Sequence, residues 1–312
     1  MKQKYRLVTR SDMDGLICAV LLKHLNMIED IKFVHPKDMQ DGIIEINEND
    51  IVTNLPYNEN AYLVFDHHLS ETIRNELKDN HIIDPDAPSA AEVIYQYYGG
   101  RDAFGEKFDD MMAAANKADS AAFSIDDILE PKGWDLLSFI MDSRTGLGRF
   151  RNFRISNYQL MMDLIDYCKD HDIDEIMKHP DVVERIELYN KYKDQFLDQL
   201  QRCSTMYEKC VVLDLTNEEI IYPGNRFMIY ALFPDAEISI HKIWGYQKRN
   251  IVFAVGKSII NKNSTINIGE LMLEYEGGGH KNAGTCQVPS AEADKILHSI
   301  LEYITQEETV CA

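Results

Sequence analysis

The chain has 312 residues, with 32 basic and 52 acidic side chains and a formal net charge of −20 at pH 7. Proteins that hold long nucleic acids rely on basic surfaces that contact phosphates, so this balance argues against binding of a long duplex. Hydrophobic residues make up 45% of the chain, but no apolar run approaches the roughly 20 residues needed to cross a bilayer, and we expect no membrane association.

Residues 1–6 lead directly into a strand-like segment, without the apolar stretch and cleavage site of a signal peptide. The six cysteines are scattered and form no C-x-x-C pair, so neither a disulfide framework nor a zinc knuckle is predicted. We therefore expect a cytoplasmic protein. The length suits two domains of ordinary size.

A short strand over residues 7–9 leads into a polar loop with Asp12, Asp14 and Gly15, and an apolar helix follows. Two carboxylates in such a loop converge on one cation, and their hard oxygens suit Mg²⁺ or Mn²⁺. The alternative is that Asp12 caps the helix and Asp14 complements the helix dipole.

Further strands are expected at residues 31–35, 50–53 and 61–65. With a helix after the first strand, this order predicts a mainly parallel sheet whose polar loops share one edge. The last of these strands ends at Asp66, His67 and His68, where open α/β sheets place their chemistry. These three side chains can bind a metal; the alternative is a strand end with two solvated histidines.

Residues 108–179 read almost entirely as helices, one of them over 134–141. A glycine-bearing loop with Asp142 and Arg144 follows that helix and suits an anion. The alternative is a helix end closed by Gly146 and salt-bridged at the surface. A long charged helix over 181–206 is predicted next, as a connector between two lobes.

The last third of the chain reads as an α/β lobe. Strands are predicted at 211–213, 227–230, 237–240 and 251–255, and helices at 268–275 and 291–304. Between the two helices stand three consecutive glycines, which are costly in backbone entropy, followed by His280. Close approach of a ligand to backbone N–H groups at a helix start would explain them; a flexible hinge is the alternative.

These motifs together resemble the DHH phosphoesterase superfamily: Asp12-Met13-Asp14-Gly15, Asp66-His67-His68, Asp142 and Gly277-Gly278-Gly279-His280. The resemblance is greatest to its two-domain members, described as exopolyphosphatase-like proteins and nanoRNases. It implies an α/β fold with a DHH domain over residues 1–180, whose mainly parallel sheet is flanked by helices. A helical linker over 181–206 and a smaller α/β DHHA1 domain over 207–312 complete it, with a cleft between the domains.

The superfamily hydrolyses phosphoesters or phosphoanhydrides with metal-activated water, usually with two Mn²⁺ ions. Residue by residue, the resemblance implies Asp14, His67 and Asp142 as ligands of one ion. Of the other ion's ligands Asp12 remains, and Asn54 stands where relatives have an aspartate that bridges both ions.

The resemblance also implies residues that contact the substrate. His68 meets the phosphate, and Asp66 supports the histidines. Independently of the resemblance, we expect Arg10, His68 and Arg144 to neutralise charge that develops on the phosphoryl oxygens. In the C-terminal domain the residues implied to grip the substrate are Lys257, Gly277, Gly278, Gly279 and His280. Lys257 stands where relatives often carry an arginine.

Two departures from the family pattern bear on the metal content. Arg10 cannot ligate a metal, and the amide of Asn54 supplies no charge. We hypothesise that Arg10 stands in for the second ion, which leaves one well-formed Mn²⁺ or Mg²⁺ site.

The sequence thus predicts a metal-dependent phosphoesterase acting on a short oligonucleotide, a 3′,5′-bisphosphonucleotide or a similar phosphorylated small molecule. One alternative is a degraded relative that binds such a ligand without turnover; a weaker one is an exopolyphosphatase. An interaction protein organised by its acidic surface rests on the net charge alone. The oligomeric state stays open, a homodimer included.

Overall fold

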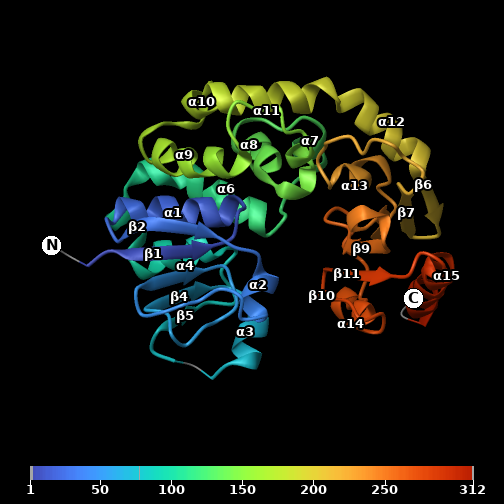
Figure 1. The fold of residues 1–312 in the computed structure, drawn as a ribbon, viewed down its shortest axis with the longest axis horizontal. Helices are drawn as coiled ribbons and strands as arrows, with labels where there is room; N and C mark the ends of the chain where they lie inside the picture. Colours follow the sequence, from blue (N-terminus) through green and yellow to red (C-terminus); the bar gives the residue numbers. More distant parts are fainter. Residues whose placement is uncertain (1–2, 77, 311–312) are drawn as a thin grey trace. The chain divides into compact units, whose positions relative to one another are not determined.

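The computed structural model describes residues 3–76 and 78–310 and divides the chain into two compact units. Unit 1 contains the residues up to Phe123 together with Pro131–Tyr189, and unit 2 contains Ser124–Glu130 together with the residues from Asn190 onward. The predicted fold class is confirmed, because unit 1 has a parallel sheet flanked by helices and unit 2 has a second α/β architecture (Figure 1). Within the described residues, no helix is both long and apolar enough to span a membrane.

Unit 1 is organised around a five-stranded sheet in the order β2-β1-β3-β4-β5, with every neighbouring pair parallel. Its strands are β1 (Tyr5–Thr9), β2 (Ile28–Phe33), β3 (Asp50–Thr53), β4 (Leu63–Asp66) and β5 (His81–Ile83). Because β3 lies between β1 and β4, the loops that follow these three strands meet at one edge of the sheet, as predicted.

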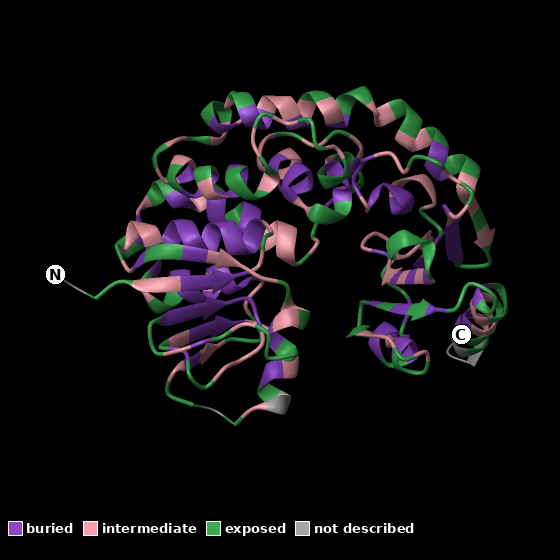
Figure 2. Ribbon diagram, in the orientation of Figure 1, coloured by how far each residue is buried: buried purple, intermediate pink, exposed green. Residues whose placement is uncertain are grey.

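The helices of unit 1 are α1 (Met13–His24), α2 (Pro36–Gln40), α3 (Leu69–Arg74), α4 (Ala90–Tyr97), α5 (Gly100–Phe104), α6 (Asp109–Asp119), α8 (Gly133–Met141), α9 (Asn157–Asp170), α10 (Ile173–Ile176) and α11 (Pro180–Lys191). Short 3₁₀ turns occur at Glu106–Phe108, Ser143–Thr145 and Leu147–Arg149. Helix α1 packs against α4, α6 and α9 and is buried along almost its whole length (Figure 2).

Both faces of this sheet are covered. Leu7, Ile51 and Phe65 belong to the core on the α1 side, whereas Val8, Val52 and Val64 belong to a second core on the other side. Burial on both faces explains why these strands read as continuous apolar runs in the sequence.

Unit 2 contains a six-stranded mixed sheet in the order β10-β11-β9-β8-β7-β6, in which β7 and β8 are parallel and the other pairs antiparallel. Its strands are β6 (Ser204–Tyr207), β7 (Cys210–Asp214), β8 (Ile238–Trp244), β9 (Ile251–Lys257), β10 (Gly278–His280) and β11 (Ala283–Val288). Its helices are α7 (Ile125–Leu129), α12 (Lys193–Cys203), α13 (Met228–Leu232), α14 (Ile268–Leu273) and α15 (Ala293–Val310), with a 3₁₀ turn at Tyr246–Lys248. The cysteines of the described residues are free thiols, and Cys311 lies outside that part.

The strand predicted over 227–230 is wrong, because this segment forms the start of α13. The Asn225 side chain accepts a hydrogen bond from the Phe227 N–H at 2.9 Å and turns the chain into the helix. Met228, Ile229 and Tyr230 are all buried, so the segment is apolar on every side. A short run of this kind has no periodicity that distinguishes a buried helix from a buried strand.

The single helix predicted over 181–206 is also wrong. It is divided into α11 and α12 at Tyr192, whose backbone (φ −104°, ψ 6°) leaves the helical region. The last residues of the predicted helix instead form β6, because they pair with β7 in an antiparallel register.

Candidate metal and phosphate site

The loop after β1 holds two aspartates in different environments. Asp12 is the N-cap of α1, and its Oδ1 accepts a hydrogen bond from the Gly15 N–H at 3.1 Å. A Cβ on Gly15 would lie 2.0 Å from the Arg10 carbonyl oxygen, so the tight loop requires glycine at this position. The other oxygen of Asp12, Oδ2, forms an ion pair with Arg10 Nε at 3.1 Å. Asp12 therefore has the capping role that was the alternative interpretation.

Asp14 lies at the N-terminus of another helix. Its carboxylate accepts hydrogen bonds from the backbone N–H groups of Ala90 at 3.1 Å and Ala91 at 2.8 Å, in the first turn of α4. Asp14 is only 1% exposed. Burial, reinforced by the nearby Asp119 and Asp12 carboxylates, raises the pKa of Asp14 to about 7. A bound cation would stabilise the ionised form of this buried carboxylate.

His67 is held at both ring nitrogens. Nδ1 lies 3.2 Å from the Ala87 carbonyl oxygen, and Nε2 lies 2.9 Å from Asp119 Oδ2. Because a carbonyl only accepts, Nδ1 carries a proton and Nε2 is the nitrogen available to a metal. Burial lowers the pKa of His67, but the hydrogen bond and charge of Asp119 outweigh it and raise the pKa to about 9.

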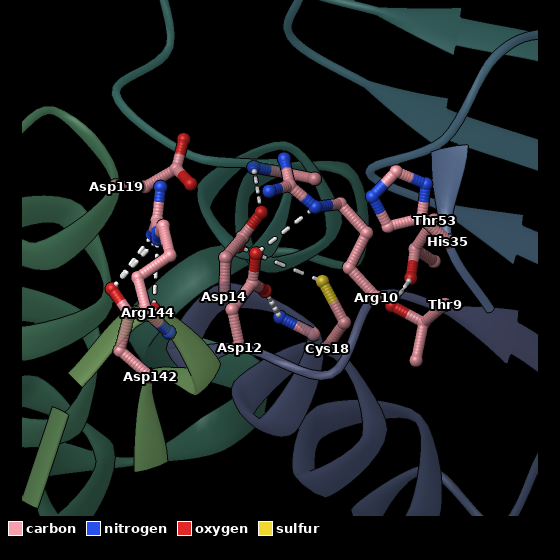
Figure 3. A network of polar contacts seen from close by, with 12 residues as sticks. Thr9, Arg10, Asp12, Asp14, Cys18, His35, Thr53, Asp119, Asp142 and Arg144 are labelled. Atoms are coloured by element: carbon pink, nitrogen blue, oxygen red, sulfur yellow. Dashed lines mark hydrogen bonds and ion pairs between the residues drawn. The ribbon is translucent and has the colours of Figure 1, made fainter. Parts of the chain in front are cut away.

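Asp14, His67 and Asp119 form the candidate metal site. One ligand atom from each residue lies within 4.8 Å of those of the other two. Two carboxylates and an imidazole are a donor set that suits Mn²⁺ and also accommodates Mg²⁺. Figure 3 shows Arg144 and Arg10 on either side of Asp12 and Asp14, with Asp119 next to Arg144. The residues present therefore fit a divalent ion.

Asp142, the third ligand that the resemblance implied, is not part of this group. Arg144 holds Asp142 through its backbone N–H at 2.8 Å, its Nε at 2.8 and 3.0 Å, and Nη2 at 2.8 Å (Figure 3). Asp142 caps the 3₁₀ turn after α8, and Gly146 follows with a left-handed φ of 88°. This geometry is that of the capped, salt-bridged loop end that was the alternative interpretation, and the structure places Asp119 rather than Asp142 beside Asp14 and His67.

Sequence reasoning missed Asp119, although the sequence contains one signal for it. Asp119 is the last residue of α6, where a negative charge opposes the helix dipole. A carboxylate in that position needs another partner. Burial raises the pKa of Asp119, but His67, followed by Arg10, outweighs burial and holds the pKa below its usual value.

Asp66 and His68 form a second pair beside the metal group. Oδ1 of Asp66 lies 2.7 Å from Nδ1 of His68, and the carboxylate of Asp66 is fully buried at the end of β4. The arrangement matches the implied supporting role of Asp66. Because an ionised carboxylate accepts, it places the Nδ1 proton of His68 on this bond.

Asn54 follows β3 at the centre of the same edge. It has a left-handed φ of 54° and is 1% exposed. Neither its Oδ1 nor its Nδ2 has a hydrogen-bond partner among the described residues. Buried polar atoms without partners are rare, and here they directly follow β3, the strand between β1, which precedes the Arg10 loop, and β4, which precedes His67.

The residues predicted in the C-terminal domain lie in unit 2. The Lys257 N–H donates to the Asn282 carbonyl at 2.8 Å, so Lys257 adjoins the hairpin formed by β10 and β11. Lys257 Nζ donates to the Ser264 carbonyl at 3.1 Å. Burial and then the nearby Lys281 lower the pKa of Lys257. Unit 2 thus groups Lys257 with the glycine hairpin and a second lysine.

Gly278 and Gly279 belong to strand β10 and Gly277 directly precedes it, which corrects the prediction of N–H groups at a helix start. A Cβ on Gly277 would lie 2.2 Å from the Thr285 carbonyl oxygen, and one on Gly279 would lie 2.3 Å from the Ala283 carbonyl oxygen. Around Gly278 no atom lies within 4 Å of such a Cβ. Close packing of β10 on β11 therefore explains Gly277 and Gly279, and Gly278 alone is open to a ligand.

The chain is similar to known proteins at the level of solved structures. No family model and no curated protein sequence matches the chain. A solved structure of a pGpG-specific phosphodiesterase, PggH from Vibrio cholerae, is 58% identical, with a TM-score of 0.85 over 97% of this chain and 99% of that one.

More distant structures share the fold. RecJ from Thermus thermophilus in complex with Mg²⁺ is 14% identical, with a TM-score of 0.54, and the match covers 98% of this chain but 50% of RecJ. CDC45 from Entamoeba histolytica is 9% identical, with a TM-score of 0.54 over 97% of this chain and 96% of that one. The identity to PggH over nearly full length and the motifs in unit 1 show that the chain belongs to the DHH superfamily of metal-dependent phosphoesterases.

Proposed function

We propose that this protein hydrolyses the internal phosphodiester bond of a short linear dinucleotide of the pGpG type. The identity of 58% to a pGpG-specific phosphodiesterase, over 97% of the chain, carries this proposal. The Asp14, His67 and Asp119 group supports it, because it offers the ligand set that metal-assisted phosphoester hydrolysis requires.

Asp14, His67 and Asp119 would hold the ion, Mn²⁺ or Mg²⁺, which supplies Lewis-acid activation of a water molecule and of the phosphoryl group. The Ala87 carbonyl orients the ring of His67 so that Nε2 lies near Asp119 and would be the nitrogen that holds the ion. The α4 N–H groups fix the Asp14 carboxylate before the ion arrives. This preorganisation reduces the rearrangement needed on binding.

In the reaction, the oxygen of water bonds to phosphorus, the bond from phosphorus to the leaving ribose oxygen breaks, and a proton passes to that oxygen. Negative charge grows on the phosphoryl oxygens. The guanidinium groups of Arg10 and Arg144 lie beside the site carboxylates and would neutralise this charge (Figure 3). His68, oriented by Asp66, would contact the phosphate.

Unit 2 would bind the substrate rather than cleave it. Lys257 supplies a cation, Gly278 leaves room for close approach to the backbone, and His280 is exposed on β10. These residues, within the predicted DHHA1 domain of residues 207–312, would set the length of substrate that is accepted.

The test is hydrolysis with Mn²⁺ of pGpG, other dinucleotides, a 3′,5′-bisphosphonucleotide and polyphosphate, followed by chromatography of the products. We expect mononucleotides from pGpG, and loss of this product in Asp119→Asn. Stabilisation of the fold by pGpG without any product would identify a protein that binds without turnover, the reading motivated by Arg10 and Asn54. Faster release of phosphate from polyphosphate than of mononucleotides from pGpG would contradict the proposal.

A further inference from the structure

The two aspartates of the loop after β1 do not both face a metal. Asp14 belongs to the candidate metal group, whereas both oxygens of Asp12 are engaged, one by the Gly15 N–H and the other by Arg10 Nε. A second divalent ion at Asp12 would have to displace this guanidinium. It would also lie close to a fixed positive charge.

The neighbouring position on β3 adds no charge to attract such an ion. Asn54 offers a neutral amide where the family resemblance places a bridging aspartate. Its side chain is almost fully buried, and neither polar atom has a partner in the described part of the chain. The two N–H donors of Nδ2 and the acceptor Oδ1 are therefore left for a bound water or substrate, without an anion for a metal.

The arginines already neutralise the carboxylates that a second ion would use. Arg10 interacts electrostatically with both Asp12 and Asp119, and Arg144 does so with the same two residues. A divalent ion is repelled by a nearby guanidinium twice as strongly as a monovalent ion at the same distance. This repulsion disfavours a second ion most at Asp12, because Arg10 is paired directly with that carboxylate, whereas no arginine forms an ion pair with Asp14 or Asp119 among the described residues.

We propose that the Arg10 guanidinium takes the place of a second metal ion, so that the site binds one divalent ion and holds the phosphoryl group with a fixed organic cation. Arg10 is suited to this role because Nε is anchored on Asp12. Its Nη groups have no hydrogen-bond partner among the described residues. Two parallel N–H groups match two phosphoryl oxygens. The phosphoryl contact rests on the proposed function, whereas the single ion does not.

The decisive measurement is the number of Mn²⁺ ions bound per chain, by equilibrium dialysis with metal analysis and by titration calorimetry. We expect one ion in the wild-type protein and two in the double variant Arg10→His with Asn54→Asp, which introduces an imidazole and a carboxylate as possible ligands. Aspartate tolerates the left-handed backbone of residue 54 nearly as well as asparagine, so this variant should fold. The matched control exchanges the same residue types at exposed positions, Arg151→His with Asn60→Asp, and should bind one ion.

Two ions in the wild-type protein, or one ion in a folded double variant, would overturn the proposal. Arg10→Lys is an independent test, because lysine keeps the positive charge but lacks the two parallel N–H groups of the guanidinium. We expect it to bind one ion and to lose about tenfold or more in kcat on pGpG; undiminished kcat would overturn the phosphoryl contact. If the wild-type protein binds one ion but cleaves none of the nucleotides, the proposed function fails and the inference about the metal stands.

Discussion

In unit 1 the candidate functional groups are buried charges, whereas in unit 2 they are partly exposed cations beside closely packed backbone. Asp14 and Asp66 are almost inaccessible, and their environment shifts the pKa values of Asp14, His67 and Asp119. In unit 2 the pKa of Lys257 is lowered, and His280 is exposed on a three-residue strand. Buried charges are costly without a partner of opposite charge. The buried carboxylates of unit 1 therefore suit the binding of a cation and a catalytic role.

The glycine hairpin of unit 2, formed by β10 and β11, is constrained by packing and not by buried charge. Its constraint is steric, since backbone oxygens of β11 occupy the space that side chains at Gly277 and Gly279 would need. Variants of unit 1 should therefore change catalysis with little effect on the fold. Variants of the hairpin should change the fold of unit 2 and the affinity for substrate.

The largest expected effect separates Asp119 from Asp142. Asp119→Asn should lower metal-dependent hydrolysis by on the order of 10³-fold and weaken Mn²⁺ binding, because it removes an anionic ligand. Asp142→Asn should lower activity by no more than about tenfold, since Asp142 acts through Arg144. Initial rates and calorimetric Mn²⁺ titration check both variants. Equal loss of Mn²⁺ affinity in the two would return Asp142 to the ligand set.

The next effect is on stability, within the hairpin of unit 2. Gly279→Ala should destabilise the protein by about 1–3 kcal/mol, because the added Cβ would collide with the Ala283 carbonyl oxygen 2.3 Å away. Gly278→Ala is the matched control, since its Cβ meets open space. Urea unfolding followed by circular dichroism measures the difference. A stable Gly279→Ala protein would show that the hairpin can relax.

A smaller effect is expected at Lys257. Lys257→Met should raise KM for pGpG about tenfold and leave kcat nearly unchanged, because the lysine would contribute equally to ground-state and transition-state binding. Lys262→Met, on an exposed residue of the following loop, is the control. A drop in kcat at constant KM would instead assign Lys257 to the chemical step.

The sequence was sufficient for the sheet of unit 1 and for the edge that carries the site. Buried parallel strands leave apolar runs with polar loops at their ends, and Asp14 and His67 stand in such loops. It was not sufficient for Asp119, because this residue ends a helix whose packing on α1 and α4 brings it to the sheet edge. The sequence also could not show that Asp142 pairs with Arg144 instead of joining Asp14 and His67, because that contact is seen only in the folded loop.

In unit 2 the local signals were weaker. The Phe227–Tyr230 segment is apolar throughout, and whether such a run forms a helix or a strand depends on what surrounds it. The glycines were read as a ligand-binding loop because the sequence does not show that β11 lies against them. A glycine needed for conformational freedom and a glycine needed for close backbone packing cannot be told apart in a sequence.

The smallest predicted effect tests whether the two units respond oppositely to pH without metal. In the folded protein the pKa of Asp14 is raised to about 7 and that of His67 to about 9, so unit 1 keeps protons that the unfolded chain loses. Its stability should fall as pH rises from about 4 to 9. Burial lowers the pKa of His241 in unit 2 to about 4, so its contribution to stability should rise between pH 4 and 6.5.

The two tryptophans allow a separate reading of each unit, because Trp134 lies in α8 of unit 1 and Trp244 ends β8 of unit 2. Thermal unfolding is followed by fluorescence in Trp244→Phe for unit 1 and in Trp134→Phe for unit 2, in a chelating buffer from pH 4 to 9. Adding Mn²⁺ should reverse the slope of unit 1 alone, because the ion competes with the proton on His67 Nε2. Parallel slopes in both variants would mean that the units unfold together.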